Sequence, residues 1–407
     1  MFELPPFEAC PFCRAEESFG LLNVHQYTFE KRCKSCRKSL SYGLPEVDKK
    51  VIYLDQFALS NLMKAANNSF RPNTNVQEVA FWKSLYNKVN NIVLKQLAVF
   101  PNSLLHLNES LLSPFHSQLE KMYEQLSGDT SFEDHETICR NQICEFAGAW
   151  IQGKAPPEIS FDIDKILDGR RNQWLPLFSI TANMNLDAMV DSTRRERDNI
   201  HNGLSEAFKV WREQGAKPFK EYVEIESRAF GMSYIEGIQN LMIKMAQAIA
   251  GTRELRYQDY LTSANTTMSM VMGVLRHYKV PEEEIPKKAI EFFQWEELKQ
   301  VPVCRIQSYL FAAMARKAAS GQTTPPSRGM MSDINMVSAY MPFCDAMFID
   351  NECAAWLAEK PLSDDLNYKA KIFCQNTKEQ FVTYLEELEA TATTEMVENA
   401  KVLYGVK

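Results

Sequence analysis

Apolar residues along this chain follow two different spacings, and each spacing predicts a different kind of element. Short runs of β-branched and aromatic residues are typical of buried strands. They occupy residues 51–55, 97–100, 345–350 and 371–374. Helical periodicity marks residues 56–66, 76–95, 332–342, 351–358 and 377–389. Strands that alternate with helices predict an α/β fold with a parallel sheet and right-handed crossovers.

A long block between the second and third strand-like runs has helical periodicity and no convincing strand pattern. It covers residues 116–300, and one further helix is predicted at 303–319. A loop rich in Gly, Ser, Thr and Pro at 320–329 precedes the return of the α/β pattern. We therefore predict an α/β domain that is split by a large all-α insertion. The predicted domain boundaries are 49–115 (first part), 116–300 (insertion), 301–390 (second part) and 391–407 (helical tail).

The first 48 residues differ in character from the rest of the chain. Cys10 and Cys13 form one Cys-x-x-Cys pair, Cys33 and Cys36 form a second, and 19 residues separate the pairs. Two such turns can present four thiolates to one tetrahedral Zn²⁺, and a segment too short to bury a core gains its stability from that bond. The spacing predicts a small zinc ribbon at residues 1–48.

Composition limits the compartment and the partners that we expect. The chain has 407 residues, 45% of them hydrophobic, but no apolar run reaches the roughly 18 residues of a membrane span. Its first residues do not resemble a signal peptide, so we expect a cytoplasmic protein with reduced cysteines and no membrane partner. The net charge of −7 indicates that a nucleic-acid partner would need a local basic patch. Candidates are Arg32, Lys34 and Arg37 near the cysteines, and Arg328.

Acidic residues stand where the predicted strands and helices meet. Asp55 closes the first strand, Glu109 follows the second, Asp333 opens a helix, and Asp345 and Asp350 flank the third strand. The carboxyl ends of parallel strands form the edge at which open α/β sheets bind ligands. Carboxylates gathered there resist ionising together unless a divalent cation such as Mg²⁺ or Mn²⁺ neutralises them. The pattern predicts metal-dependent phosphodiester hydrolysis.

In these segments the chain resembles the PIN-like ribonuclease domains. The resemblance rests on residues 53–57 at the first strand, on 101–109 leaving the second, and on 332–350. The last segment has an Asp that opens a helix with an aromatic-rich end, then an Asp-led apolar strand that finishes in a second Asp. Residues 372–385 also look like the closing strand and helix of such domains.

The resemblance implies a PIN-like Rossmannoid parallel sheet and a particular set of metal ligands. Asp55, Glu109, Asp333 and Asp350 would hold one or two Mg²⁺ or Mn²⁺ ions, with Asp345 as a support or an alternate ligand. The implied activity is that of an endoribonuclease, in a setting such as a toxin or a defence effector, with a regulatory protein partner as a further option. Two alternatives remain open. One is a DNA-directed nuclease that uses the same acids, and the other is a non-catalytic adaptor that keeps the fold and binds nucleic acid or protein.

One basic segment of the insertion requires separate mention. Residues 194–201 are loosely similar to the Arg and His pair of helical HEPN-type ribonucleases, which cleave RNA without a metal. Charges of both signs alternate in this segment, which favours a salt-bridged helix surface.

Overall fold

The computed structural model describes residues 3–177 and 187–406, and its central element is a parallel β-sheet. The strands are β5 (Lys50–Leu54), β6 (Ala98–Val99), β9 (Ala346–Phe348) and β10 (Lys371–Phe373). Their order is β10-β9-β5-β6, and every neighbouring pair is parallel. The prediction of a mixed α/β fold with a parallel sheet is confirmed.

Helices bury both faces of this sheet. Because side chains alternate along a strand, Ile52 and Leu54 join one apolar cluster whereas Val51 and Tyr53 join another. The first face is covered by α1 (Gln56–Ala66), α2 (Val76–Leu94), α4 (His116–Ser127) and α15 (Lys378–Glu389). The second is covered mainly by α5 (His135–Ile151), α11 (Pro302–Ala319), α12 (Met330–Tyr340) and α13 (Asn351–Ala358).

Two short helices and a 3₁₀ turn complete the α/β part. They are α3 (Leu104–Leu111) after β6 and α14 (Leu362–Asp365) before β10, with the 3₁₀ turn η3 (Gln375–Thr377) leading into α15. The helices α1 and α13 begin and end at the predicted residues, and α12 begins two residues earlier than predicted.

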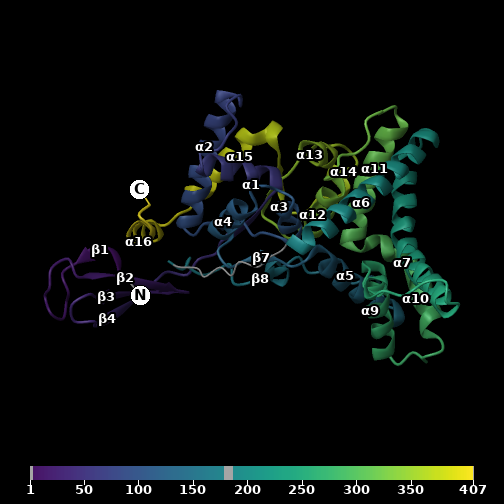
Figure 1. Ribbon diagram of the computed structural model, residues 1–407, viewed down its shortest axis with the longest axis horizontal. Coiled ribbons are helices and arrows are strands. Elements are labelled where there is room, and N and C mark those ends of the chain that lie inside the picture. Colours follow the sequence, from purple (N-terminus) through teal and green to yellow (C-terminus); the bar gives the residue numbers. More distant parts are fainter. Residues whose placement is uncertain (1–2, 178–186, 407) are drawn as a thin grey trace.

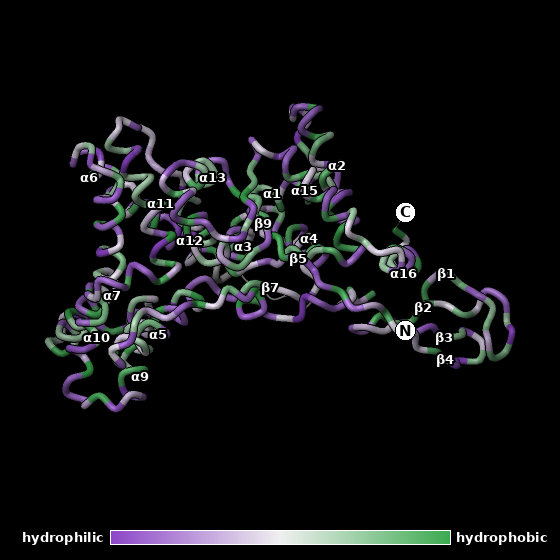
Figure 2. Tube along the Cα trace, turned by 180° about the vertical axis from the view of Figure 1, so that it is seen from behind, coloured by the Kyte–Doolittle hydropathy of each residue, from purple (hydrophilic) through white to green (hydrophobic). Residues whose placement is uncertain are grey.

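The insertion forms the end of the molecule that lies far from the N-terminus (Figure 1). The predicted insertion, residues 116–300, includes α4 and α5, which cover the sheet. Its other helices are α6 (Asp187–Glu213), α7 (Phe219–Ile249), α8 (Tyr257–Tyr260), α9 (Ser263–His277) and α10 (Ile285–Phe293), with 3₁₀ turns η1 (Ile163–Lys165) and η2 (Glu296–Gln300). Figure 2 shows hydrophilic and hydrophobic positions alternating along α6 and α7, as in amphipathic helices. The insertion is not purely helical, because β7 (Ser131–Phe132) and β8 (Leu167–Asp168) pair antiparallel within it.

The N-terminal segment is a separate antiparallel sheet at the opposite end of the molecule (Figure 1). Its strands in order are β1 (Leu4–Glu8), β2 (Phe19–His25), β3 (Thr28–Cys33) and β4 (Ser39–Gly43). It packs on Trp174 and on Leu403 of the C-terminal helix α16 (Thr394–Tyr404). The backbone N–H and indole N–H of Trp174 donate to Gln26 and Pro45 at 2.9 and 2.8 Å, which fixes the small sheet to the body.

None of the helices in the described part of the chain combines the length and the apolar character that a membrane span requires.

Candidate functional site

The order of the strands creates a crevice beside β5. The chain passes from β5 to β6 on one side, and later returns on the other side of β5 as β9. Open α/β sheets bind ligands at such a switch point, outside the carboxyl ends of the strands. Asp55 directly follows β5, and Asp350 lies two residues beyond β9. The topology therefore brings these two carboxylates to the same crevice.

Both of these aspartates are held by the helices that they begin. Asp55 caps α1, and its Oδ1 accepts a hydrogen bond of 2.6 Å from the backbone N–H of Gln56. Asp350 caps α13, and its Oδ1 accepts from the N–H groups of Glu352 and Cys353 at 2.7 and 3.0 Å. The other oxygen of Asp350, Oδ2, is buried and has no hydrogen-bond partner. A buried acceptor without a partner is costly, and a bound ligand would satisfy it.

Two helices from other parts of the sequence bring the remaining acids. Glu109 lies in α3, after β6, and Asp333 lies in the first turn of α12. All four acids line one pocket of about 590 Å³. Its other lining residues are Gln56, Phe57, Asn61, Glu78, Trp82, Arg197, Gly329, Asn351 and Gln375. The structure thus brings together four of the five acids that were predicted from the sequence.

Burial, together with repulsion from neighbouring acids for the two aspartates, makes Asp55, Glu109 and Asp333 hard to ionise. Burial, with the neighbouring charges of Glu109 and Asp350, raises the pKa of Asp55 to about 8. Burial and the other three acids hold the pKa of Asp333 well above its usual range. Burial also raises the pKa of Glu109, although Arg197 and the Ser332 hydroxyl oppose the shift. A divalent cation in the pocket would relieve this repulsion, because it favours the ionised form of each acid.

The carboxylates are spread more widely than the ligands of a closed metal cage. In the described part of the chain, only the N-terminal cysteines form a group of three or more ligand atoms that all lie within 4.8 Å of one another. Oxygens that bind one Mg²⁺ at about 2.1 Å are at most about 4.2 Å apart. The acids as placed would therefore hold an ion through few direct contacts, with waters completing its shell.

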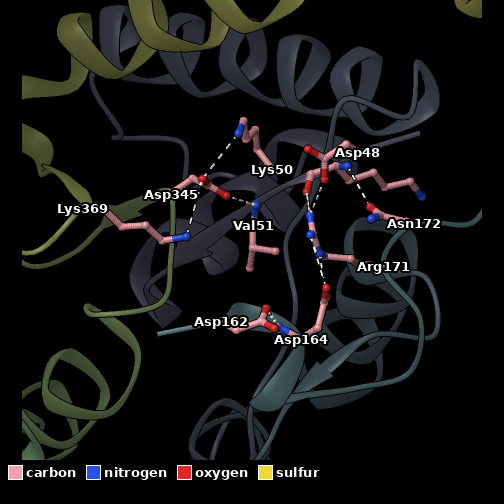
Figure 3. A network of polar contacts seen from close by, with 10 residues as sticks. Asp48, Lys50, Val51, Asp162, Asp164, Arg171, Asn172, Asp345 and Lys369 are labelled. Carbon is pink, nitrogen blue, oxygen red and sulfur yellow. Dashed lines mark hydrogen bonds and ion pairs between the residues drawn. The ribbon is translucent and has the colours of Figure 1, made fainter. Parts of the chain in front are cut away.

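Asp345 lies at the other end of β9 and does not line the pocket. Its Oδ2 accepts from the backbone N–H of Val51 at 2.9 Å, and its Oδ1 lies 3.6 and 3.9 Å from the ammonium groups of Lys50 and Lys369 (Figure 3). Asp345 was predicted as a support or an alternate ligand of the ion, but the structure places it outside the pocket, because it precedes β9 whereas Asp350 follows the opposite end of the strand. Asp345 instead ties the start of β9 to the start of β5.

The basic residues predicted to contact nucleic acid do not line the pocket. Arg32 and Arg37 form ion pairs with Glu3 at 2.7 and 3.1 Å, and the ammonium of Lys34 lies 3.2 Å from the ring centre of Phe7. These contacts hold the N-terminal strand onto the cysteine knuckles. Arg328 instead pairs with Asp198 of α6 at 3.4 Å.

Arg197 is the basic residue that sequence reasoning missed. It lies among the lining residues of the pocket, whereas the whole segment 194–201 was interpreted as a helix surface. Residues 197, 204, 208 and 211 recur at helical spacing, and the last three, Leu204, Phe208 and Trp211, are buried. An arginine on the apolar face of a helix was the signal that could have revealed it.

The four cysteines of the N-terminal sheet are brought together as predicted. Sγ–Sγ distances are 3.7 Å for both Cys10–Cys36 and Cys13–Cys33. Four sulfurs at about 2.3 Å from one Zn²⁺ would be about 3.8 Å apart at the corners of a tetrahedron. The cysteines could therefore bind a metal such as zinc.

Local backbone geometry builds the two cysteine turns alike. Arg14 and Arg37 follow the two pairs and have positive φ angles of 62° and 61°. The backbone N–H of each arginine donates to the carbonyl oxygen of the first cysteine of its pair. Backbone N–H groups also point at the sulfurs, as from Ser35 and Cys36 to Cys33 at 3.3 and 3.4 Å. Although burial opposes ionisation, hydrogen bonds from Ser18 and these N–H groups lower the pKa of Cys33 to about 5. A stabilised thiolate is the form that binds Zn²⁺.

Comparison of the chain with family models, curated proteins and solved structures finds no match. The resemblance to PIN-like domains stays a prediction from the residues themselves. A function for this protein is therefore inferred from the geometry and chemistry of the acidic pocket.

Proposed function

We propose that this protein is a metal-dependent nuclease that hydrolyses phosphodiester bonds, with RNA as the favoured polymer. One observation carries the proposal. Five acids line a single pocket at the switch point of a parallel sheet: Glu78 and the four predicted from the sequence, which come from four separate elements. A buried oxygen of Asp350 there has no partner. A structural role for each acid alone does not explain why they gather in spite of the repulsion between them.

The donor set fits Mg²⁺ or Mn²⁺. These cations prefer oxygen ligands, and Mg²⁺ usually keeps several waters and takes only one or two carboxylates. The wide spacing of Asp55, Glu109, Asp333 and Asp350 suits such a partly hydrated ion. The Asp350 Oδ2, which has no hydrogen-bond partner, and the carboxylates of Asp55, Glu109 and Asp333 would hold this ion.

The residues of the chain prepare the pocket for hydrolysis of a phosphodiester. The caps on α1 and α13 hold Asp55 and Asp350 in fixed orientations, so these acids need little rearrangement when a ligand binds. When bound, a divalent ion supplies a water of lowered pKa and stabilises charge on the phosphate oxygens. Attack of water on phosphorus, with the 3′ oxygen leaving and taking up a proton, yields a 5′-phosphate and a 3′-hydroxyl.

The test is cleavage of end-labelled RNA and DNA of mixed sequence by the full chain. Reactions contain Mn²⁺ or EDTA, and Asp55→Asn is assayed in parallel with Asp345→Asn as the matched control from outside the pocket. We expect Mn²⁺-dependent cleavage of RNA that Asp55→Asn lowers by at least about a hundredfold, while Asp345→Asn stays within a few-fold of the original chain. Cleavage of DNA alone would show that the substrate is DNA and not RNA. Absence of cleavage with intact RNA binding would favour the adaptor.

A further inference from the structure

Helix α6 of the insertion brings a positive charge to the acidic pocket. Arg197 lines the pocket together with Asp55, Glu109 and Asp333. It is half-buried, whereas Arg194 on the same helix is exposed. The insertion is therefore part of the wall of the pocket, and Arg197 is its charged contribution.

The position of Arg197 is fixed by the packing of α6 against two other helices. This helix packs against α11 and against α12, the helix that carries Asp333. Leu204 and Phe208, further along α6 on the same face, are buried in the core below the sheet. The neighbour Asp198 pairs at 3.4 Å with Arg328, which lies shortly before α12. Arg197 and Asp333 thus belong to one packed unit.

The guanidinium of Arg197 has no direct partner among the described residues. Arg194 and Arg195 of the same helix bond to the side chain and the backbone oxygen of Asp191 at 3.5 and 3.1 Å. In the described part of the chain, the guanidinium of Arg197 makes no hydrogen bond and no acid lies within the 4.0 Å of an ion pair with it. It acts on Glu109 and Asp333 through space. A half-buried guanidinium has five N–H donors, and here no protein oxygen of the described residues accepts from them. Such a group is suited to bind a ligand that lies between it and the acids.

We propose that Arg197 binds a phosphate of the nucleic-acid strand, so that the insertion supplies a substrate contact inside the pocket. The inference rests on the proposed function. The two free oxygens of a phosphodiester match the planar fork of a guanidinium, which is the usual reason for arginine at phosphate sites. A residue that merely neutralised the acids would be expected in direct contact with one of them, and Arg197 is not.

The inference is tested with Arg197→Ala, Arg197→Lys and the control Arg194→Ala from the exposed side of α6. We expect Arg197→Ala to lower kcat/KM for RNA by roughly ten- to a hundredfold, because a charge-assisted hydrogen-bond pair is lost. Arg197→Lys keeps the charge without the fork and should recover part of the loss. Arg194→Ala should stay within about twofold. Thermal melting of each variant shows that the fold is retained.

A second measurement separates this inference from the nuclease proposal. Binding of a fluorescent single-stranded RNA to Asp55→Asn is compared with binding to the double variant Asp55→Asn/Arg197→Ala, without metal, over a range of salt. Loss of one phosphate contact should weaken binding and reduce the slope of log K against log salt by about 0.7. This result would uphold the role of Arg197 even if the original chain cleaves nothing.

Two outcomes would overturn the inference. One is unchanged RNA binding and cleavage in Arg197→Ala. The other is tighter Mn²⁺ binding in Arg197→Ala with unchanged RNA binding, which would make Arg197 an internal counter-ion of the acids instead.

Discussion

Asp55 serves two tasks that place different demands on one side chain. Its Oδ1 caps α1, a task that either Asp or Asn performs well. Its carboxyl group is also buried among other acids, and the proposed role as a cation ligand would require it to be ionised there. Asp55→Asn therefore removes the charge and keeps the cap, and this makes it a clean probe of the pocket.

The first prediction at the residue scale concerns stability without metal. Because the pKa of Asp55 is raised from 3.8 to about 8, the folded state keeps a proton that the unfolded state loses as the pH rises. The contribution of Asp55 to stability is thus present below about pH 4 and is lost as the pH rises through 8. Asp55→Asn should change stability little at pH 4 and stabilise the protein at pH 8, by an amount on the order of 5 kcal/mol at most. Thermal or urea unfolding in EDTA at both pH values measures this, and equal effects at both would contradict it.

Metal binding should show the opposite dependence on pH. The ligands must lose their protons, so the affinity for Mn²⁺ should rise between pH 6 and 8 by up to roughly tenfold per pH unit for each proton displaced. Calorimetry in two buffers with different ionisation enthalpies counts the protons released. Release of no proton would show that Mn²⁺ binds elsewhere.

At the scale of elements, the two ends of β9 provide a matched pair of aspartates. Asp350 is at the end that faces the pocket, and Asp345 joins the start of β9 to Val51 and Lys50. We expect Asp350→Asn to weaken Mn²⁺ binding by at least about tenfold, since the cap on α13 survives and the ligand charge does not. Asp345→Asn should leave Mn²⁺ affinity unchanged and lower stability by about 1 kcal/mol. Equal loss of Mn²⁺ affinity in both variants would argue against a site at one end of the strand.

Trp174 is buried against the N-terminal sheet, so its fluorescence can report on metal binding by the four cysteines. A metal on the four cysteines would stabilise the small sheet, which has little core of its own. Cys33→Ser or a strong chelator should unfold the ribbon and shift Trp174 fluorescence to the red, while most of the helical circular dichroism remains. The zinc content of the purified protein identifies the metal. The same experiment with Trp174→Phe shows whether the change in fluorescence comes from Trp174. An unchanged spectrum after metal removal would contradict this account.

Much of the element order could be predicted from the sequence, because local patterns determine it. The bounds of α1 and α13 were predictable because each follows an apolar run that ends in a capping aspartate. The pair β7 and β8 was not, because both strands lie in a block whose pattern is dominated by helical periodicity, whereas the equally short β6 lies in the apolar run 97–100. The pairing of β9 with β5 is a long-range contact that local patterns do not reveal. The sequence therefore did not decide whether Asp345 or Asp350 lies in the pocket. Arg197 was missed because its partners come from distant segments.

At the scale of the whole molecule, the insertion and the sheet share a core. α11 contacts α6 and α7 of the insertion as well as α12, and its apolar residues join those of the sheet in one cluster. The insertion is thus distant in sequence from the acids but adjacent to them in space, as Arg197 shows.

Deletion of residues 116–300 should therefore prevent cooperative folding. The deletion removes Trp211 and Phe219, on which the rings of Phe311 and Tyr309 of α11 pack. It also removes α4 and α5, which cover the two faces of the sheet, so apolar surface is exposed. We expect an aggregating or dye-binding product without a sharp thermal transition. Deletion of residues 1–48, which pack through a small separate cluster, should leave a cooperative transition and serves as the control. A cooperative melt of the first variant would show that the insertion is an independent domain.

The central claim is that the pocket lined by Asp55, Glu109, Asp333 and Asp350 holds the divalent ion. The most direct test is the anomalous difference map of a crystal of the full chain soaked in Mn²⁺ at pH 8. Our account predicts a peak about 2.1 Å from oxygens of at least two of these acids, and no peak there in Asp55→Asn crystals soaked at the same low concentration. A map with no peak in the pocket, or with Mn²⁺ bound only at other surface acids, would contradict it.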